Sequence, residues 1–215
     1  MSWQRRDTPA HRIPKASSGV MRLRHLAEQS EAAEEKMSEL RPRFEAMRGE
    51  EKQDAKRWYQ EFETPRALAR RMVCMADIDQ HLSVLEPSAG KGRLLEPMPG
   101  YADVYACEIQ QCNRELITDL FPHVQIVGQD FMEVTGTYDR VVMNPPFYRG
   151  TDIKHVMHAY GLLKPGGKLV SLCYNGRAQN QILQEWVDSW EVLPAGMFKE
   201  SGTGASVVLL TKCKE

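Results

Sequence analysis

The chain has 215 residues, of which 42% are hydrophobic and 27% are charged, and its net charge at pH 7 is −1. This length fits one folded domain with an appendage, because single cores seldom exceed roughly 250 residues. No apolar run reaches the roughly 18 residues that a membrane span needs, and the N-terminus lacks the apolar centre of a secretory signal. We therefore expect a globular, cytoplasmic protein without a membrane segment.

Cysteine and histidine residues give no sign of a disulfide framework or a metal site. The five cysteines are odd in number, are never spaced as C-x-x-C, and lie mostly in apolar stretches, where a thiol behaves as a small hydrophobic group. His155 and His158 lie three residues apart on a predicted helix without a carboxylate cluster nearby. Solvated or capping roles are therefore favoured for these two histidines over metal binding.

The first 61 residues differ in pattern from the rest of the chain. Residues 1–20 form a basic arm rich in proline and serine, and residues 1–24 hold six basic side chains against one acidic side chain. Such an arm either binds phosphates through salt-sensitive contacts or is a flexible terminus, and the sequence favours neither. Over residues 21–61, apolar positions at three- and four-residue steps predict a helical extension interrupted at Pro42. Packing on the chain's own core is favoured for this stripe, with a homodimer through the same helices as the alternative.

From residue 62 onward, short β-rich runs alternate with helical segments, which is typical of a parallel sheet covered by helices. The loop GMFKESGTGA between the last two runs is too short for a crossover helix, so these strands should pair antiparallel. The sequence thus predicts an α/β fold with a Rossmann-like, seven-stranded sheet that is mostly parallel, its last strand being antiparallel. The expected strands are Ser83–Leu85, Val104–Cys107, Gln125–Val127, Arg140–Met143, Lys168–Cys173, Glu191–Leu193 and Ser206–Thr211. The first expected helix has its N-cap at Thr64 and runs through Val73, and a second lies near Leu94. The remaining expected helices are Gln110–Leu120, Ile153–Leu163 and Gln179–Ser189.

Chemically distinctive residues follow the first three strands, and α/β folds bind ligands at the carboxyl ends of their strands. The first strand leads into EPSAGKG (residues 86–92), whose two glycines allow a tight turn and whose following helix N-terminus could offer N–H groups to a ligand. The second ends at Glu108, which could accept both hydroxyls of a ribose. The third ends at Asp130-Phe131, where an acceptor for an adenine amino group stands beside an apolar wall. Each feature also has an ordinary reading in turns and helix ends, so none identifies a ligand alone.

The fourth strand runs directly into Asn144-Pro145-Pro146-Phe147. The prolines fix their own φ angles and hold Asn144 extended, so that the Asn144 amide and the Pro145 carbonyl form a rigid pair of acceptors. Such a pair can bind both hydrogens of a planar –NH₂ group and localise its lone pair, while Phe147 stacks against the target. This motif predicts chemistry at an exocyclic amino nitrogen through positioning rather than through a strong base.

The set EPSAGKG, CE, QDF and NPPF, in this order and with strand–helix spacing, resembles the class I S-adenosylmethionine-dependent methyltransferases of the adenine-N6 group. The resemblance covers about residues 62–215, which would form the methyltransferase domain with its seven-stranded sheet, and it implies S-adenosyl-L-methionine as cofactor. It includes FETP, which is similar to the F-x-T-P segment that closes over the methionine part of the cofactor in that family. The resemblance assigns Thr64 and Pro65 to the methionine pocket, Glu86, Ala89, Gly90 and Gly92 to the cofactor loop, Glu108 to the ribose, Asp130 beside Phe131 to the adenine, and Asn144, Pro145, Pro146 and Phe147 to the target.

Three substrates present the planar –NH₂ group that this motif needs: adenine in DNA, adenine in RNA, and the side-chain amide of glutamine. The resemblance favours nucleic acid, because glutamine methyltransferases usually carry NPPY and a D-x-G-x-G-S-G loop. It favours DNA within that class, because EPSAG together with F-x-T-P is more similar to the DNA adenine enzymes. Since about 155 residues of core leave no sizeable target-recognition domain, we expect loose sequence specificity, with the first 60 residues contacting the nucleic-acid backbone. The alternative from another class is a non-catalytic binding or decoy module, for which a broken NPPF or a lost ribose acid would be the sign.

Overall fold

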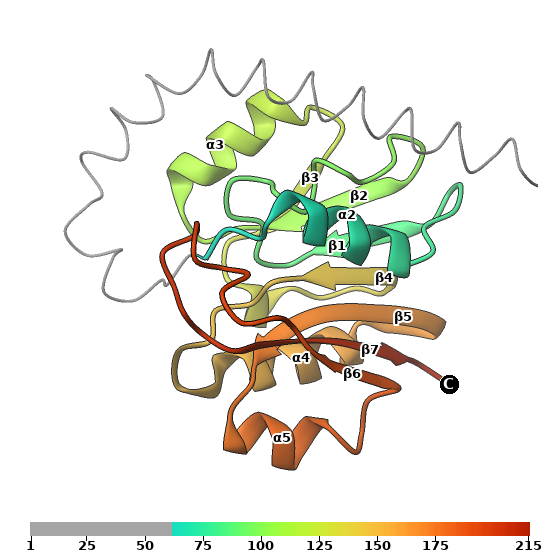
Figure 1. Ribbon diagram of the computed structural model, residues 1–215. Coiled ribbons are helices and arrows are strands. Elements are labelled where there is room, and N and C mark those ends of the chain that lie inside the picture. The colour runs from blue at the N-terminus through green and yellow to red at the C-terminus, as the bar shows by residue number, and fades with distance from the viewer. Residues whose placement is uncertain (1–61) are drawn as a thin grey trace, which may run out of the picture.

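The computed structural model describes residues 62–215 (Figure 1). The basic arm predicted over residues 1–20, the helical extension predicted over residues 21–61 and the homodimer through it all lie outside the described residues. Residues 62–215 contain one sheet with the strand order β3-β2-β1-β4-β5-β7-β6. Its strands are β1 (Ser83–Glu86), β2 (Asp103–Cys107), β3 (Gln125–Gly128), β4 (Tyr138–Met143), β5 (Leu163–Tyr174), β6 (Ser189–Val192) and β7 (Val207–Cys213).

The sheet has the predicted α/β topology. Strands β1 to β5 pair in parallel, whereas β7 runs antiparallel to both β5 and β6. Each of the seven expected strands overlaps its observed strand, so the prediction of a mostly parallel sheet with a reversed last strand is confirmed. The reversed strand lies between β5 and β6 rather than at the edge. Strand β1 lies between β2 and β4, at the point where the strand order reverses.

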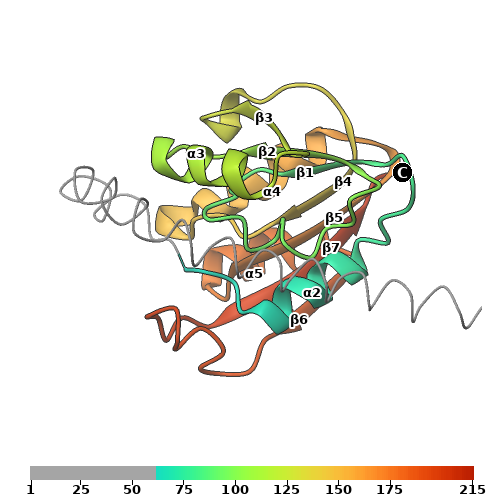
Figure 2. The same cartoon turned by 90° about the horizontal axis from the view of Figure 1, so that it is seen from above.

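Helices cover both faces of the sheet (Figures 1 and 2). The core on one face joins side chains of α2 and α3 to alternate strand residues such as Val142 and Val170. The core on the other face joins α4 and α5 to the neighbouring residues, such as Val141 and Leu169. Because successive strand residues point to opposite faces, a run such as Val141-Val142-Met143 is buried throughout. The helices are α2 (Arg66–Met75), α3 (Gln111–Leu120), α4 (Thr151–Gly161) and α5 (Arg177–Leu183), and none of those within residues 62–215 is long and apolar enough to cross a membrane.

The helix predicted near Leu94 is wrong, because the chain between β1 and β2 forms successive turns. Gly90 and Gly92 have φ angles of +52° and +87°, which no helix residue adopts. Pro97 and Pro99 then remove two backbone donors that a continuing helix would need. The apolar residues around Leu94 nevertheless point into the core.

Several other helix ends differ from their prediction by one to six residues, and two of them have a clear physical cause. Pro65, not Thr64, is the N-cap of α2, because the Thr64 hydroxyl is used by a partner far away in the sequence. Helix α5 ends at Leu183 instead of continuing to Ser189, where β6 already begins. The chain between them forms turns and a bend, so the helical pattern over this segment was read too far.

Candidate active site

A cavity of about 440 Å³ lies at the carboxyl ends of β1, β2 and β4, and is closed by the loop after β3 and the segment before α2. It lies where the strand order reverses, which is the usual ligand position in an open α/β sheet, and its volume is in the range of small-molecule sites. Pro65 and Gly92 do not line it. The predicted site residues that do line it are Thr64, Glu86, Ala89, Gly90, Glu108, Asp130, Phe131, Asn144, Pro145, Pro146 and Phe147.

Glu86, the last residue of β1, is fully buried at one wall of this cavity. Its Oε1 accepts a hydrogen bond from the Ser88 N–H at 3.0 Å, whereas Oε2 has no partner among residues 62–215. Burial, and to a smaller extent the neighbouring Glu108, raise the pKa of Glu86 well above its usual range. Because a buried carboxylate oxygen without a partner is costly, this wall is suited to a cationic or hydrogen-bond-donating ligand group.

Glu108 connects the loop after β1 to the beginning of α3. Its Oε2 accepts a hydrogen bond from the Gly90 N–H at 2.7 Å, and its Oε1 accepts one from the Gln110 N–H at 2.8 Å. The N–H of Gly90 therefore binds a protein carboxylate instead of belonging to a free helix N-terminus, which corrects the expectation for this loop. These bonds hold the Glu108 carboxylate in a defined position at the cavity wall.

The two glycines of the loop have different reasons to be glycine. A Cβ added at Gly90 would meet no atom within 4 Å, and Gly90 lines the cavity. A Cβ added at Gly92 would lie 2.4 Å from Cε2 of Phe121, the C-cap residue of α3. Gly92 therefore permits close packing behind the loop, while Gly90 leaves space for a ligand.

Asp130 and the residues after it form the wall beyond β3. The Oδ1 of Asp130 accepts a hydrogen bond from the Met132 N–H at 2.9 Å and so caps the short 3-10 helix η1 (Phe131–Glu133). Phe131 is buried and belongs to the core as well as to the cavity wall. Met132 and Ile109 are the exposed apolar side chains at this end, with exposed fractions of 46% and 41%, and both line the cavity. They provide apolar surface for a flat ligand group.

His155 of α4 is not the solvated or capping side chain that the sequence suggested, whereas His158 is half-buried with its Nε2 3.1 Å from the carbonyl of Val134, the C-cap residue of η1. Both rings contact Phe131 edge to face, with centroid distances of 5.1 Å and 4.8 Å. His155 is buried at the cavity wall, its Nδ1 has no partner among residues 62–215, and burial lowers its pKa to about 4. In this part of the chain, no group of three or more His, Cys, Asp or Glu side chains could hold a metal ion.

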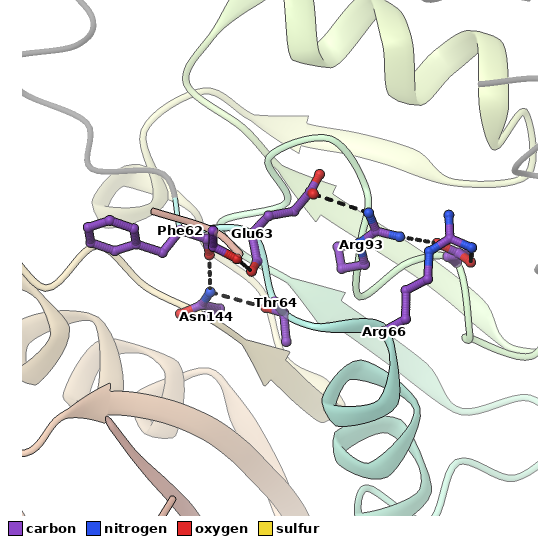
Figure 3. Close-up of polar contacts among 8 residues, drawn as sticks. Phe62, Glu63, Thr64, Arg66, Arg93 and Asn144 are labelled. Carbon is purple, nitrogen blue, oxygen red and sulfur yellow. Dashed lines mark hydrogen bonds and ion pairs between the residues drawn. The ribbon is translucent and has the colours of Figure 1, made fainter. Parts of the chain in front are cut away.

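Asn144, the first residue after β4, has its side-chain amide held by the segment before α2 (Figure 3). Its Nδ2 donates to the Phe62 carbonyl at 2.8 Å and to the Thr64 Oγ1 at 3.1 Å. Both amide hydrogens are therefore used. Since Asn144 lines the cavity, Oδ1 is the polar atom of the amide that remains to accept a hydrogen bond from a ligand.

Residues Phe62–Thr64 form what we call the strap, which lines the cavity and is tied to three parts of the fold. Besides holding Asn144, it forms an ion pair between Glu63 Oε2 and Arg93 at 3.1 Å. Arg93 also pairs with Glu96 at 3.0 Å, within the loop after β1. Ser201 Oγ, from the loop before β7, donates to the Glu63 carbonyl at 2.6 Å. Figure 3 shows Glu63 and Arg93 turned toward each other and Asn144 beneath the strap.

Other residues that line the cavity were not assigned from the sequence. Ile109 and Met132 each follow an assigned residue directly, and this adjacency was a usable signal. Lys154 and His155 come from α4, and nothing in their local pattern indicates that the helix places them at this cavity. Among the lining residues that the sequence did not assign to the site are Phe62, Glu63, Arg93, Ile109, Met132, Lys154 and His155.

Residues 101–199 match the methyltransferase small domain family. No curated protein sequence matches the chain. Among solved structures, TrmN from Thermus thermophilus is similar at 20% identity and a TM-score of 0.55, over 70% of this chain and 49% of that chain. A putative RNA methyltransferase from Pyrococcus horikoshii is similar at 16% identity and a TM-score of 0.58, over 73% of this chain and 88% of its own. The 23S rRNA methyltransferase ErmE is similar at 16% identity and a TM-score of 0.54, over 72% of this chain and 70% of its own.

The family match covers residues 101–199, and the sheet of the described residues has the fold of the solved methyltransferases to which the chain is similar. At these identities the solved structures show a shared fold, and this chain spans about half the length of TrmN. The cofactor of such methyltransferases is S-adenosyl-L-methionine, which carries a sulfonium and an ammonium group. The cavity wall carries the carboxylates of Glu108 and Asp130 and the Glu86 Oε2, which has no partner among residues 62–215. These acidic oxygens fit a cationic ligand.

Proposed function

We propose that this chain transfers a methyl group from S-adenosyl-L-methionine to the N6 nitrogen of adenine in DNA. The observation that carries this proposal is the fixed amide of Asn144, whose hydrogens are both used by the strap while its oxygen remains as an acceptor at the cavity. When bound, the cofactor would supply an electrophilic methyl group on a sulfonium. The target nitrogen, held at Asn144, would take this methyl group with its lone pair as the sulfonium becomes a thioether, and would lose one proton to solvent.

The residues around Asn144 can prepare a weakly nucleophilic amine for this displacement. Asn144 Oδ1 and the Pro145 carbonyl would each accept one hydrogen of the target –NH₂ group, which draws its lone pair out of the ring system. Neither Pro145 nor Pro146 has an N–H group, and both have their φ angles fixed, so the pair of acceptors stays rigid. Phe147, partly buried against the core, would stack on the target ring. Preorganised acceptors of this kind lower the barrier without a general base.

The residues at the ends of β1 to β3 would hold the cofactor. Glu86 Oε2 would accept hydrogen bonds from the ammonium group, since this buried oxygen otherwise has no partner among residues 62–215. Glu108 would bind the ribose hydroxyls and Asp130 the adenine amino group, with Ile109 and Met132 as apolar walls. Thr64 would lie at the methionine part, whereas Pro65 and Gly92 would act indirectly, through the start of α2 and the packing behind the loop.

DNA is favoured because EPSAG together with FETP resembles the DNA adenine enzymes. Adenine in RNA is the second candidate, because the P. horikoshii protein and ErmE are named as RNA methyltransferases. A base in a duplex would have to flip out of the stack to reach this cavity. Since residues 62–215 are used by the sheet, its helices and their connections, we propose loose sequence specificity.

The test is to incubate the full chain with labelled S-adenosyl-L-methionine and, separately, with DNA, RNA or a protein extract. We expect label in DNA as N6-methyladenine, and we expect Asn144→Ala to lower the rate by about a hundredfold, as loss of a preorganised hydrogen-bonding group does in other enzymes. Asn180→Ala is the matched control, because Asn180 lies in α5 and does not line the cavity. Label in RNA alone would transfer the proposal to RNA adenine, and label in protein alone to glutamine. An Asn144→Ala rate equal to that of the parent would refute it.

A further inference from the structure

We propose that the strap is a positioning element of the active site: the Phe62 carbonyl and the Thr64 hydroxyl set the orientation of the Asn144 amide. This inference rests on the proposed function, since it concerns how the proposed acceptor is made ready. Thr64 and Phe62 are positioning residues in this scheme, because they act on the target only through Asn144.

An asparagine needs such a device because its amide has two nearly isosteric ends. One end, Oδ1, accepts hydrogen bonds, and the other, Nδ2, only donates them. A half turn of the amide would present an –NH₂ group to the –NH₂ group of the target, and neither could accept from the other. Half of the rotamers available to an unrestrained Asn144 would therefore be unproductive.

The strap distinguishes the two orientations by its own chemistry. The Phe62 carbonyl lies 2.8 Å from Nδ2 and can only accept, so a flipped amide would place oxygen against oxygen there. The Thr64 hydroxyl lies 3.1 Å from the same nitrogen and is a second acceptor in the observed orientation. Losing the bond to the Phe62 carbonyl while bringing two acceptors together disfavours the flipped amide by roughly tenfold or more. The Thr64 hydroxyl can also donate, so it holds the plane of the amide while the Phe62 carbonyl decides which end faces the cavity. The same contacts explain an amide rather than a carboxylate at position 144, because a carboxylate has no hydrogen for Phe62.

The rest of the fold holds the strap in place. Thr64 is 4% exposed, directly before the N-cap of α2. Glu63 is tied on one side to Arg93 of the loop after β1 and on the other side to Ser201 of the loop before β7. Because these anchors come from two separate segments of the fold, the position of the strap does not depend on Asn144 alone.

A separate reading of Thr64 is direct contact with the cofactor, as the family resemblance implies. The two roles are compatible, because a hydroxyl that accepts from Asn144 still has one hydrogen to donate. The two roles of Thr64 predict changes in different kinetic constants. Loss of a cofactor contact weakens cofactor binding, whereas loss of Asn144 orientation lowers the rate of transfer at saturating cofactor.

The test compares Thr64→Val, which keeps the shape and removes the hydroxyl, with Thr64→Ser, which keeps the hydroxyl. We expect Thr64→Val to lower kcat on DNA about tenfold while the Kd of S-adenosyl-L-methionine changes less than about twofold, because one hydrogen bond of this kind corresponds to about tenfold in rate. Thr64→Ser should restore kcat to within about threefold. Thr118→Val is the matched control, since among residues 62–215 the Thr118 hydroxyl donates to the Arg114 carbonyl on the exposed side of α3, away from the cavity.

Two further measurements separate positioning from general damage. In the Asn144→Ala background, Thr64→Val should cause no additional loss of kcat, because the group that it positions is gone. In ¹⁵N–¹H spectra, the Asn144 side-chain amide, assigned by its absence in Asn144→Ala, should exchange with solvent faster in Thr64→Val than in the parent or in Thr64→Ser.

The inference is overturned by a parental kcat in Thr64→Val, by a loss that lies entirely in cofactor Kd, or by an equal loss in the Asn144→Ala background. The amide measurement does not depend on activity. If the parent binds cofactor but methylates no adenine, and the amide is still protected through Thr64, the proposed function fails and the positioning role stands. If the parent methylates adenine and the amide is unprotected, the positioning role fails alone.

Discussion

Replacing each glycine of the loop after β1 by alanine should have opposite consequences for stability and binding. At Gly92 the added Cβ would lie 2.4 Å from Phe121 Cε2, and Phe121 is buried, so the ring and α3 must shift. Such overpacking costs about 1–3 kcal/mol, and the φ angle of +87° adds to it, which places the free energy of unfolding about 3 kcal/mol below that of the parent. At roughly 2–4 °C per kcal/mol for a domain of this size, Tm should fall by about 6–12 °C.

At Gly90 the same substitution meets no atom within 4 Å, so the cost in stability is the backbone strain at φ +52° alone. That strain is about 1 kcal/mol and is partly offset by the smaller conformational entropy of alanine in the unfolded chain. Because Gly90 lines the cavity, its new methyl group would instead occupy ligand space. We expect the Kd of S-adenosyl-L-methionine to rise at least about tenfold in Gly90→Ala.

Urea and thermal denaturation of the cofactor-free proteins measure the first effect, and calorimetric titration with the cofactor measures the second. Gly161→Ala is the matched control, because it lies at the end of α4, has no atom within 4 Å of an added Cβ, and has no positive φ angle. Equal losses of Tm in the two loop variants would refute the assignment of Gly92 to packing. Unchanged cofactor affinity in Gly90→Ala would refute the assignment of Gly90 to the ligand wall.

Three other predictions concern charge and thiol chemistry. Burial raises the pKa of Glu86 above its ordinary 4.5, so the stability that this group contributes is fully present below pH 4.5 and is lost as the pH rises. The urea midpoint of the cofactor-free parent should therefore decline between pH 5 and 8, and Glu86→Gln should lack this decline. Glu86→Gln should also bind the cofactor about tenfold more weakly. For Asp139, hydrogen bonds from Lys164 and Ser83 outweigh burial and lower its pKa to about 2, so its stability is full above the ordinary 3.8 and is lost toward pH 2. Asp139→Asn should be about 1 kcal/mol less stable at pH 7, with a gap that shrinks below pH 4 in a urea series, unlike a gap caused by packing. Iodoacetamide at pH 8 should label the exposed Cys74 and Cys213 in the native protein, and all five cysteines after denaturation. The other three cysteines are buried, and burial raises the pKa of the Cys107 thiol to about 12. Labelling of Cys107 in the native protein, detected by mass spectrometry, would contradict this prediction.

The fold could be predicted from the sequence where the pattern is local. A parallel strand buried on both faces is a continuous apolar run, as in Val141-Val142-Met143, and each such run was recognisable without its neighbours. The helix expected near Leu94 does not form, although the apolar residues there face the core, because the segment turns at Gly90 and Gly92 with positive φ angles. Periodicity reports which side chains face the core, but it does not report the φ angles by which they do so.

The candidate site was also recognisable in part. Residues at strand ends converge because parallel strands end at one edge, so Glu86, Glu108 and Asn144 could be placed together from their positions alone. The same reasoning could not assign different roles to Gly90 and Gly92. The packing role of Gly92 depends on its contact with Phe121, the residue at the end of α3. Nor could it find His155, whose buried position follows from how α4 packs on Phe131.

The sequence by itself determined the class of sheet, the order of the strand-end motifs and the chemistry that each could perform, because these depend on residues close together along the chain. Only the tertiary structure decided how the Asn144 amide is turned. Its two acceptors, the Phe62 carbonyl and the Thr64 hydroxyl, stand 82 and 80 residues earlier in the chain. Contacts at such separation are made by the packing of the whole sheet and its connections, and no local pattern specifies them.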